Sequence, residues 1–267
     1  MPTLEEIKAK QQVTWSSGDY GKIAWITQPL SEVLLDAVDV RPGSEVLDVA
    51  TGTGHVALAA GRRFAKATGS DYVPALLDVA RGRAKVEGLD VTFKEGDAEA
   101  LPFPDSSFDY VLSTIGAMFA PNQEKTASEL IRVARPGGTI GMVNWRPEGF
   151  LGELFRTIAA HVPPPEGLKP AALWGSEDRV RELFGDDVSS ISFKDGAIRI
   201  GFLSPEHFAD FFVSNYGPTL KASEALEGER KEAFHRDLVQ LATRHNTRTD
   251  GTASWDWTYL VVVAIKK

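Results

Sequence analysis

Three acidic side chains follow three successive apolar segments in the first half of the sequence. Asp48 lies near the end of segment 45–50, Asp71 follows the second segment, and Asp97 follows the third. The carboxyl ends of parallel strands meet at one edge of a sheet, where ligands bind, so the three carboxylates would share one site. Carboxylates accept hydrogen bonds from hydroxyl and amino groups and attract cations. The spacing therefore predicts a site for a ligand that carries such groups.

Segment 46–54, Val-Leu-Asp-Val-Ala-Thr-Gly-Thr-Gly, is typical of a strand that passes through a glycine turn into a helix. Gly52 and Gly54 let a ligand approach the backbone, and the helix N-terminus offers free N–H groups. Two features differ from the dinucleotide fingerprint: Asp48 would repel a pyrophosphate, and Ala57 replaces the third glycine. The pattern favours a cofactor with a positive charge and no phosphate. The alternative is a tight turn in which Asp48 caps a helix.

The other two carboxylates indicate a nucleoside. Asp71 is placed to accept hydrogen bonds from both hydroxyls of a ribose, and Tyr72 can pack on the sugar or base. Asp97 can accept a hydrogen bond from an adenine amino group, while the Ala98 N–H donates to a ring nitrogen. The alternative for Asp71 is a helix cap.

The elements that must position these residues alternate strands with helices, which is typical of a parallel sheet in an α/β fold. We predict strands at 45–50, 65–70, 91–94, 109–114 and 139–144, and helices around 30–37, 56–64, 74–88 and 127–134. In the second half we predict a short helix after Ser176, strands at 190–193 and 259–264, and a mobile loop at 246–254. Between these last strands we predict two helices, one from Ser204 and one at 228–245, that form an inserted cap over residues 202–250.

The segments LDVATGTG, SDY, EGDAEALPFPDSSFD and RVARPGG together resemble the class I S-adenosylmethionine-dependent methyltransferases. Within them, the sequence is similar to the group that includes the ubiquinone/menaquinone-biosynthesis methyltransferases, over about residues 40–145. The resemblance implies a Rossmann-like, seven-stranded, mostly parallel sheet. It also implies methyl transfer from S-adenosyl-L-methionine to a small-molecule acceptor by in-line displacement. Two positions depart from the group: Ala50 replaces the first glycine of the turn, and 115–119 lacks a Gly-Leu-Arg-Asn pattern, which disfavours a quinone acceptor.

The resemblance also implies roles for particular residues. Those at the cofactor are Asp48, Ala50, Thr51 and Gly52 around the methionine part, Asp71 and Tyr72 at the ribose, Asp97 and Ala98 at the adenine, Thr114 at the sulfonium and Tyr20 over the carboxylate. Segment 15–20 resembles an N-terminal lid, so we expect a lid at 1–24 and a single methyltransferase domain at 25–267. The alternative for Trp15 and Tyr20 is the packing of an N-terminal helix.

Met118, Phe119 and Trp145 are our candidates for binding the acceptor, and no residue stands out as a catalytic base. Ser113-Thr114 replaces the Asp that metal-assisted O-methylation needs, and the absence of Cys excludes the cytosine C5 enzymes. The five histidines lack ligand spacing, so we expect no metal. Two alternatives stay open: a module that binds the cofactor without turnover, and a nucleotide-dependent oxidoreductase, which would need a Tyr-x-x-x-Lys pair that the sequence lacks.

The composition of the chain limits the kinds of molecule that the protein is expected to bind. The chain has 267 residues, a net charge of −8 and no Cys, which excludes disulfides and thiolate chemistry and argues against binding nucleic acid. The N-terminus has no apolar signal region, and the longest apolar run, 259–265, is too short to span a membrane. We therefore expect a cytoplasmic monomer or homodimer that contacts neither nucleic acid nor membrane.

Overall fold

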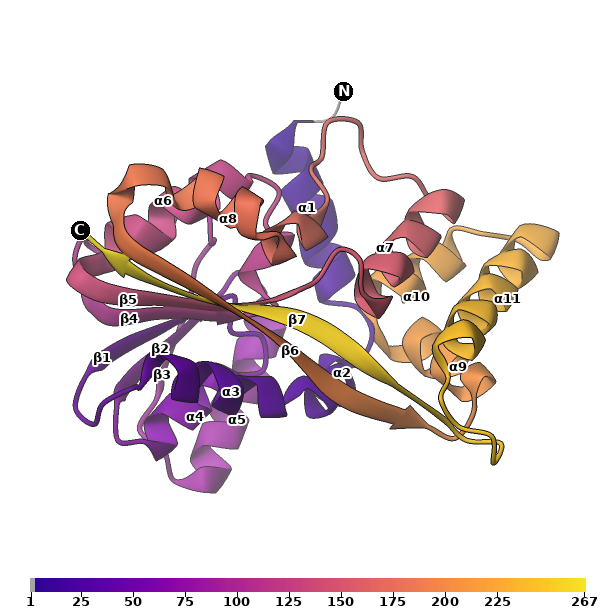
Figure 1. Ribbon diagram of the computed structural model, residues 1–267, viewed down its shortest axis with the longest axis horizontal. Coiled ribbons are helices and arrows are strands. Elements are labelled where there is room, and N and C mark those ends of the chain that lie inside the picture. The colour runs from indigo at the N-terminus through magenta and orange to yellow at the C-terminus, as the bar shows by residue number, and fades with distance from the viewer. Residues whose placement is uncertain (1–2) are drawn as a thin grey trace.

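A seven-stranded sheet runs through the centre of the molecule, with helices on both faces (Figure 1). The computed structural model describes residues 3–267. The strand order is β3-β2-β1-β4-β5-β7-β6, and only β7 runs antiparallel to its two neighbours. The strands are β1 (Glu45–Val49), β2 (Lys66–Asp71), β3 (Thr92–Glu95), β4 (Phe108–Thr114), β5 (Ala134–Trp145), β6 (Val188–Phe202) and β7 (Ala253–Lys266). The predicted Rossmann-like, seven-stranded, mostly parallel sheet is confirmed.

Helices α3 (Pro29–Val38), α4 (His55–Arg62) and α5 (Pro74–Glu87) cover one face of the sheet, while α6 (Gln123–Val133) and α8 (Glu177–Phe184) cover the other (Figure 1). Proline suits the first turn of α5, and Gly88 ends this helix in the left-handed conformation that glycine adopts without strain. These helices lie close to their predicted positions, because each buries an apolar stripe against the sheet.

The strands at the far edge of the sheet are longer than predicted. We expected 190–193 and 259–264, but β6 and β7 pair along their whole lengths. β6 is an edge strand whose side chains are mostly half-buried or exposed. Because many of them are polar, its sequence lacks the apolar run by which we recognised the other strands. The predicted loop 246–254 is shorter too, since Ala253 and Ser254 belong to β7. Its two ends are joined by Asn246, whose Oδ1 accepts a hydrogen bond from the Ser254 N–H at 2.9 Å.

Between β6 and β7 the structure contains three helices where we predicted two. They are α9 (Pro205–Asn215), α10 (Gly217–Glu224) and α11 (Gly228–His245). Helix α10 was not predicted; it begins at Gly217-Pro218, and proline is favourable in the first turn of a helix. Helix α7 (Phe150–His161) was also missed, and the short helices η1 (Ala117–Phe119), η2 (Ala171–Gly175) and η3 (Gly185–Asp187) complete the fold.

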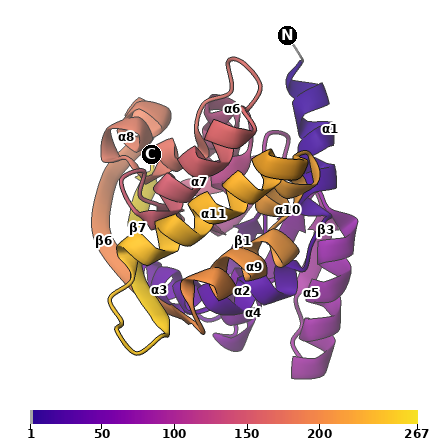
Figure 2. The same cartoon turned by 90° about the vertical axis from the view of Figure 1, so that its right-hand side faces the viewer.

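Helices α7, α9, α10 and α11 form a cap beside the sheet. Figure 2 shows α11 crossing in front, with α7 above it and α9 below. His161 of α7 bonds to Asp237 of α11 at 2.7 Å, and His245 of α11 bonds to Glu153 of α7 at 3.0 Å. Under these pairs the aromatic residues Phe208, Phe212 and Phe234 are buried. The cap is thus joined to the sheet by a continuous apolar core.

The N-terminal segment folds into α1 (Leu4–Trp15) and α2 (Tyr20–Thr27). A capping box starts α1: Thr3 Oγ1 accepts from the Glu6 N–H at 3.2 Å, and the Thr3 N–H donates to Glu6 Oε2 at 2.8 Å. Ile7 is the buried residue of this helix, in keeping with its weak apolar pattern. Residues 1 and 2 of the predicted lid lie outside the described residues. No helix in 3–267 has the length and apolar character to span a bilayer.

The loops after β1 and β4 touch each other. A Cβ placed on Gly116 would lie 2.3 Å from the carbonyl oxygen of Ala50, so this contact needs glycine. Both neighbouring backbones are turned sharply: Ala50 has φ of 54° and Ile115 has φ of 66°. Because these loops lie at the carboxyl edge of the sheet, their close approach sets the shape of that edge.

We expect Gly116→Ala to lower the free energy of unfolding by about 1–3 kcal/mol, since the added methyl group overpacks a rigid backbone contact. Gly82→Ala is the matched control, because Gly82 lies exposed in α5 with open space around its Cα. This control should raise stability by roughly 0.5–1 kcal/mol through helix propensity. Urea unfolding measures both variants, and equal stability changes would contradict the contact described above.

Candidate functional site

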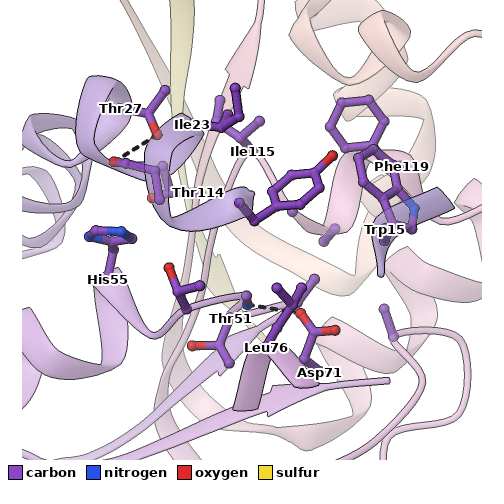
Figure 3. Close-up of a pocket in the computed structure, with 18 of the residues that line it drawn as sticks. Trp15, Ile23, Thr27, Thr51, His55, Asp71, Leu76, Thr114, Ile115 and Phe119 are labelled. Carbon is purple, nitrogen blue, oxygen red and sulfur yellow. Dashed lines mark hydrogen bonds between the residues drawn. The ribbon is translucent and has the colours of Figure 1, made fainter. Parts of the chain in front are cut away.

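A cavity lies along the carboxyl edge of the parallel strands and encloses about 1370 Å³ of atom-free space, open solvent at its mouth included. Strand ends, the N-terminal helices and the cap all contribute walls. Figure 3 shows Asp71 and Thr51 on its lower side and Ile23 and Ile115 above them. All ten residues that the sequence places at the cofactor line this cavity: Tyr20, Asp48, Ala50, Thr51, Gly52, Asp71, Tyr72, Asp97, Ala98 and Thr114.

Asp48 is almost fully buried at the end of β1, with 1% of its surface exposed. Its Oδ2 accepts hydrogen bonds from Thr51 Oγ1 at 2.5 Å and from the Ala57 N–H at 3.0 Å. The carboxylate therefore braces the turn and the start of α4, as the capping alternative predicted, while it also lines the cavity. Burial raises the pKa of Asp48 to about 7.

Asp71 ends β2 and is 5% exposed. Its Oδ2 accepts from the Gly52 N–H at 2.8 Å, and its Oδ1 accepts from the Val73 N–H at 3.0 Å. Burial raises the pKa of this carboxyl to about 6, although the two backbone donors favour the charged form. Each oxygen accepts one backbone hydrogen bond, which leaves acceptor capacity on both for a ligand.

Asp97 lines the cavity, has 33% of its side chain exposed and contacts the N-terminal helix. Lys8 of α1 reaches Asp97 Oδ2 and Glu99 Oε2, both at 2.6 Å. Burial lowers the pKa of Lys8, but the bonds to the two carboxylates outweigh this effect and raise it. Gln12 also donates to the Tyr72 carbonyl at 2.5 Å, so α1 is joined to the loops after β2 and β3. We did not predict Lys8, because α1 gives no apolar signal.

Two hydroxyl groups at the cavity wall have no hydrogen-bond partner among the described residues. These are Thr114 Oγ1 and the Tyr20 hydroxyl oxygen, both buried. Burial raises the pKa of Tyr20 well above its ordinary value, so this phenol stays neutral. Buried hydroxyls are normally paired. Thr114 is therefore available to a ligand in the cavity, whereas the Tyr20 hydroxyl also lies near the Gly217 backbone N–H.

The other end of the cavity is apolar. Phe119 and Trp145 line it as predicted, but Met118 does not: its side chain is fully buried in the core behind η1. The structure thus corrects the position of Met118, because the short helix after β4 turns that side chain inward. Other wall residues that we did not predict are Leu151 of α7, Tyr216 between α9 and α10, and Trp257 of β7, all distant in sequence from the strand ends.

His55, the first residue of α4, also lines the cavity, and it was not among the site residues that we predicted. It lies against Arg83, with the two side chains 3.0 Å apart at Nε2 and Nη1. Burial lowers the pKa of His55 to about 3, and the Arg83 charge acts in the same direction. The imidazole is therefore neutral at physiological pH.

The pKa of Asp48 predicts a pH-dependent stability. A folded-state pKa near 7, above the ordinary 3.8, stabilises the fold at low pH, and this contribution is lost as pH rises through 7. Asparagine cannot ionise, so the stability of Asp48→Asn minus that of the wild type should rise from pH 5 to pH 8, by at most about 1.4 kcal/mol per pH unit. Urea unfolding at several pH values tests this, with Asp90→Asn as an exposed control. A difference that does not change with pH would contradict the proposed burial effect.

Comparisons with known proteins agree with this geometry. A family model described as a methyltransferase domain matches residues 46–138. An uncharacterized protein of Mycobacterium tuberculosis strain H37Rv is 38% identical over 268 residues, which covers 98% of this chain and 96% of that protein. A demethylmenaquinone methyltransferase of Thermus thermophilus is 41% identical over 135 residues, or 48% of this chain and 61% of that enzyme.

Comparison with solved structures finds methyltransferases of similar fold. A solved structure of geranyl diphosphate methyltransferase in complex with SAM has a TM-score of 0.52 and 19% identity, and it covers 90% of this chain and 85% of that one. At this identity the likeness concerns the fold alone. The family model covers the strands that carry all three carboxylates, and the full-length relative extends the kinship over the cap. The chain therefore belongs to the class I methyltransferases and resembles the menaquinone-biosynthesis group within them.

Proposed function

We propose that this protein transfers a methyl group from S-adenosyl-L-methionine to a small-molecule acceptor. The observation that carries the proposal is the set of three carboxylates at the ends of β1, β2 and β3, all in one cavity beside a glycine turn. The family model and the relatives support methyl transfer in general. A cytoplasmic location and a monomeric or homodimeric state remain predictions.

The residues fit this cofactor in their donor and acceptor chemistry. Asp71 has acceptor capacity left on both oxygens, which suits the two hydroxyls of a ribose. Asp97 would accept from the adenine amino group, with Tyr72 and Ala98 beside it. Asp48 would lie near the ammonium group, and a cation there would lower the pKa of this carboxyl and favour its charged form.

The protein would contribute to the reaction by holding the reacting groups in position and by excluding water from the sulfonium. When bound, the cofactor supplies a methyl group on a sulfonium, which is already a good leaving group. Thr114 would line that position, and Trp15 and Tyr20 would shield it from solvent. Alignment of the reacting groups and removal of water account for much of the rate enhancement in such displacements.

Helix α1 would act as the lid. Its polar contacts with the cavity wall join Lys8 to Asp97 and Glu99, Gln11 to the Phe119 carbonyl, and Gln12 to the Tyr72 carbonyl. Its Trp15 ring also packs against Phe119, with the ring centroids 4.8 Å apart. The polar contacts are weaker than an apolar interface, since they replace hydrogen bonds to water. Opening of α1 would break these polar contacts and the packing of Ile7 and Trp15 while the sheet stays intact, and it would give the cofactor a route of entry.

We expect Asp71→Ala to weaken the binding of S-adenosylhomocysteine strongly. Loss of one charge-assisted hydrogen bond costs about 1.5–3 kcal/mol, so loss of both predicts about a hundredfold or more. Asp109→Ala is the matched control, because Asp109 also accepts a backbone N–H, from Glu45 at 2.9 Å, at the opposite edge of the sheet. Isothermal titration calorimetry of folded variants tests both. An unchanged affinity in Asp71→Ala would refute the assignment.

The lid predicts a change in hydrogen exchange. Amides over residues 10–26 should exchange faster in the free protein than in the complex with S-adenosylhomocysteine, since ligand contacts offset the entropy of ordering the segment. Hydrogen exchange with mass spectrometry measures this, and the buried strand β1 serves as an internal control. Equal protection in both states would show that α1 and α2 are permanent scaffold.

A further inference from the structure

Lys8 of α1 holds two carboxylates that follow β3. Its ammonium nitrogen lies 2.6 Å from Asp97 Oδ2 and 2.6 Å from Glu99 Oε2. In the described part of the chain, neither carboxylate forms an ion pair with any other cation. One positive charge is thus shared between two negative charges, at the side of the cavity where we place the adenine.

Glu99 fixes the position of the ammonium group. Its side chain is 5% exposed, and its Oε1 accepts a hydrogen bond at 2.7 Å from the N–H of Asn122, the N-cap of α6. A buried carboxylate is stable only with partners of this kind. Because Glu99 is held inside the protein, the Lys8 ammonium stays beside it and within reach of Asp97.

Asp97 is less confined than Glu99, since 33% of its side chain is exposed. Two bonds restrain it: Oδ1 accepts from the Glu99 N–H at 2.9 Å, and Oδ2 accepts from Lys8. Together they fix the plane of the carboxylate, and each oxygen keeps capacity for a further hydrogen bond. Without Lys8 the carboxylate would be held at one oxygen alone, and it would turn toward water and away from the charge of Glu99.

Lys8 differs in this respect from the other polar residues of α1 that contact the strand-end loops. Gln11 and Gln12 donate to the backbone carbonyls of Phe119 and Tyr72, whose positions the chain itself sets. Lys8 instead contacts a side chain that we propose to touch the cofactor. All three contacts would hold α1 closed, but only the contact from Lys8 would in addition orient a ligand-binding group.

Building on the proposed function, we infer that Lys8 is a positioning residue for adenine recognition, which holds Asp97 in place to accept a hydrogen bond from the adenine 6-amino group. Lys8 acts through Asp97 and need not touch the cofactor. Its charge also offsets the repulsion between Asp97 and Glu99, so that Asp97 stays ionised and acts as an acceptor only. Selectivity for the amino group, and not only overall affinity, should therefore depend on Lys8.

Two ligands isolate this selectivity: S-adenosylhomocysteine and its deamino analogue, in which hydrogen replaces the 6-amino group of the purine. Both keep the ribose, the amino-acid part and the ring nitrogens. Isothermal titration calorimetry gives the dissociation constant of each, and the amino selectivity is the analogue's constant divided by that of S-adenosylhomocysteine. Loss of one hydrogen bond to a charged acceptor predicts a ratio of about ten to a hundred for the wild-type protein.

We expect Lys8→Met to lower this ratio about three- to tenfold, because the ammonium is lost while an unbranched side chain remains. Lys8→Arg should restore most of the ratio, since a guanidinium can donate to both carboxylates. Lys10→Met is the matched control, because Lys10 is exposed on the same helix, and it should leave the ratio unchanged. In an Asp97→Ala background, Lys8→Met should not change the ratio further, because Lys8 acts through Asp97.

The outcomes separate this inference from the proposed function and from a purely structural role. If S-adenosylhomocysteine does not bind the wild-type protein, the proposed function is wrong. If it binds and Lys8→Met weakens both ligands equally, Lys8 only holds α1 closed and the inference is overturned. A ratio that rises in Lys8→Met would overturn it as well, since Lys8 would then compete with adenine for Asp97. A wild-type ratio near one has the same consequence, and urea unfolding verifies that each variant is folded.

Discussion

The hydrogen bond from the Gly52 N–H to the Asp71 carboxylate joins the two loops on which the site depends. Parallel pairing of β1 with β2 brings the ends of both strands to one edge, and this bond then fixes the glycine turn against the end of β2. Asp48 completes the brace by holding Thr51 and the first turn of α4. The same carboxylates thus stabilise the loops and face the cavity. Burial raises the pKa of both carboxyl groups, because their charged forms are less well solvated in the folded protein.

A different kind of interaction closes the cavity. Most of the molecule is held by a continuous apolar core, but α1 contributes only Ile7 to it as a buried residue. Its polar links to the body run from Lys8, Gln11 and Gln12 to strand-end loops, and at its end the half-buried Trp15 ring packs against Phe119 and Tyr216. Local opening favours segments with few buried apolar contacts. The physical difference between core and lid therefore matches the proposed division between a rigid sheet and a segment that admits the cofactor.

The cap contributes aromatic and apolar side chains to the cavity wall. β7 lies beyond β4 in the sheet order, and Phe212 of α9 lies 5.8 Å from Trp257 of β7, so these aromatic side chains meet at the side of the cavity away from the carboxylates. Histidine–carboxylate pairs join α11 to α7 and, through His235 and Asp210, to α9, so the helices that support this wall are linked on their outer surface. The carboxylates and the aromatic side chains of the wall thus lie on opposite sides of Thr114, the last residue of β4.

Local sequence determined most of the first half of the protein. Strands β1 to β5 and the helices between them carry buried runs, prolines and glycines whose effects act over a few residues, so their order and the shared edge of Asp48, Asp71 and Asp97 followed from spacing. The resemblance to the methyltransferase family, not spacing, suggested Tyr20 and Thr114 as cofactor residues. Tertiary structure decided the rest. β6 pairs fully only because β7 lies beside it, and Met118 turns into the core behind η1. Lys8 meets Asp97 across 89 residues, and Trp257 meets Trp145 across more than a hundred. Contacts at such separations depend on how the chain packs as a whole, and no local pattern encodes them.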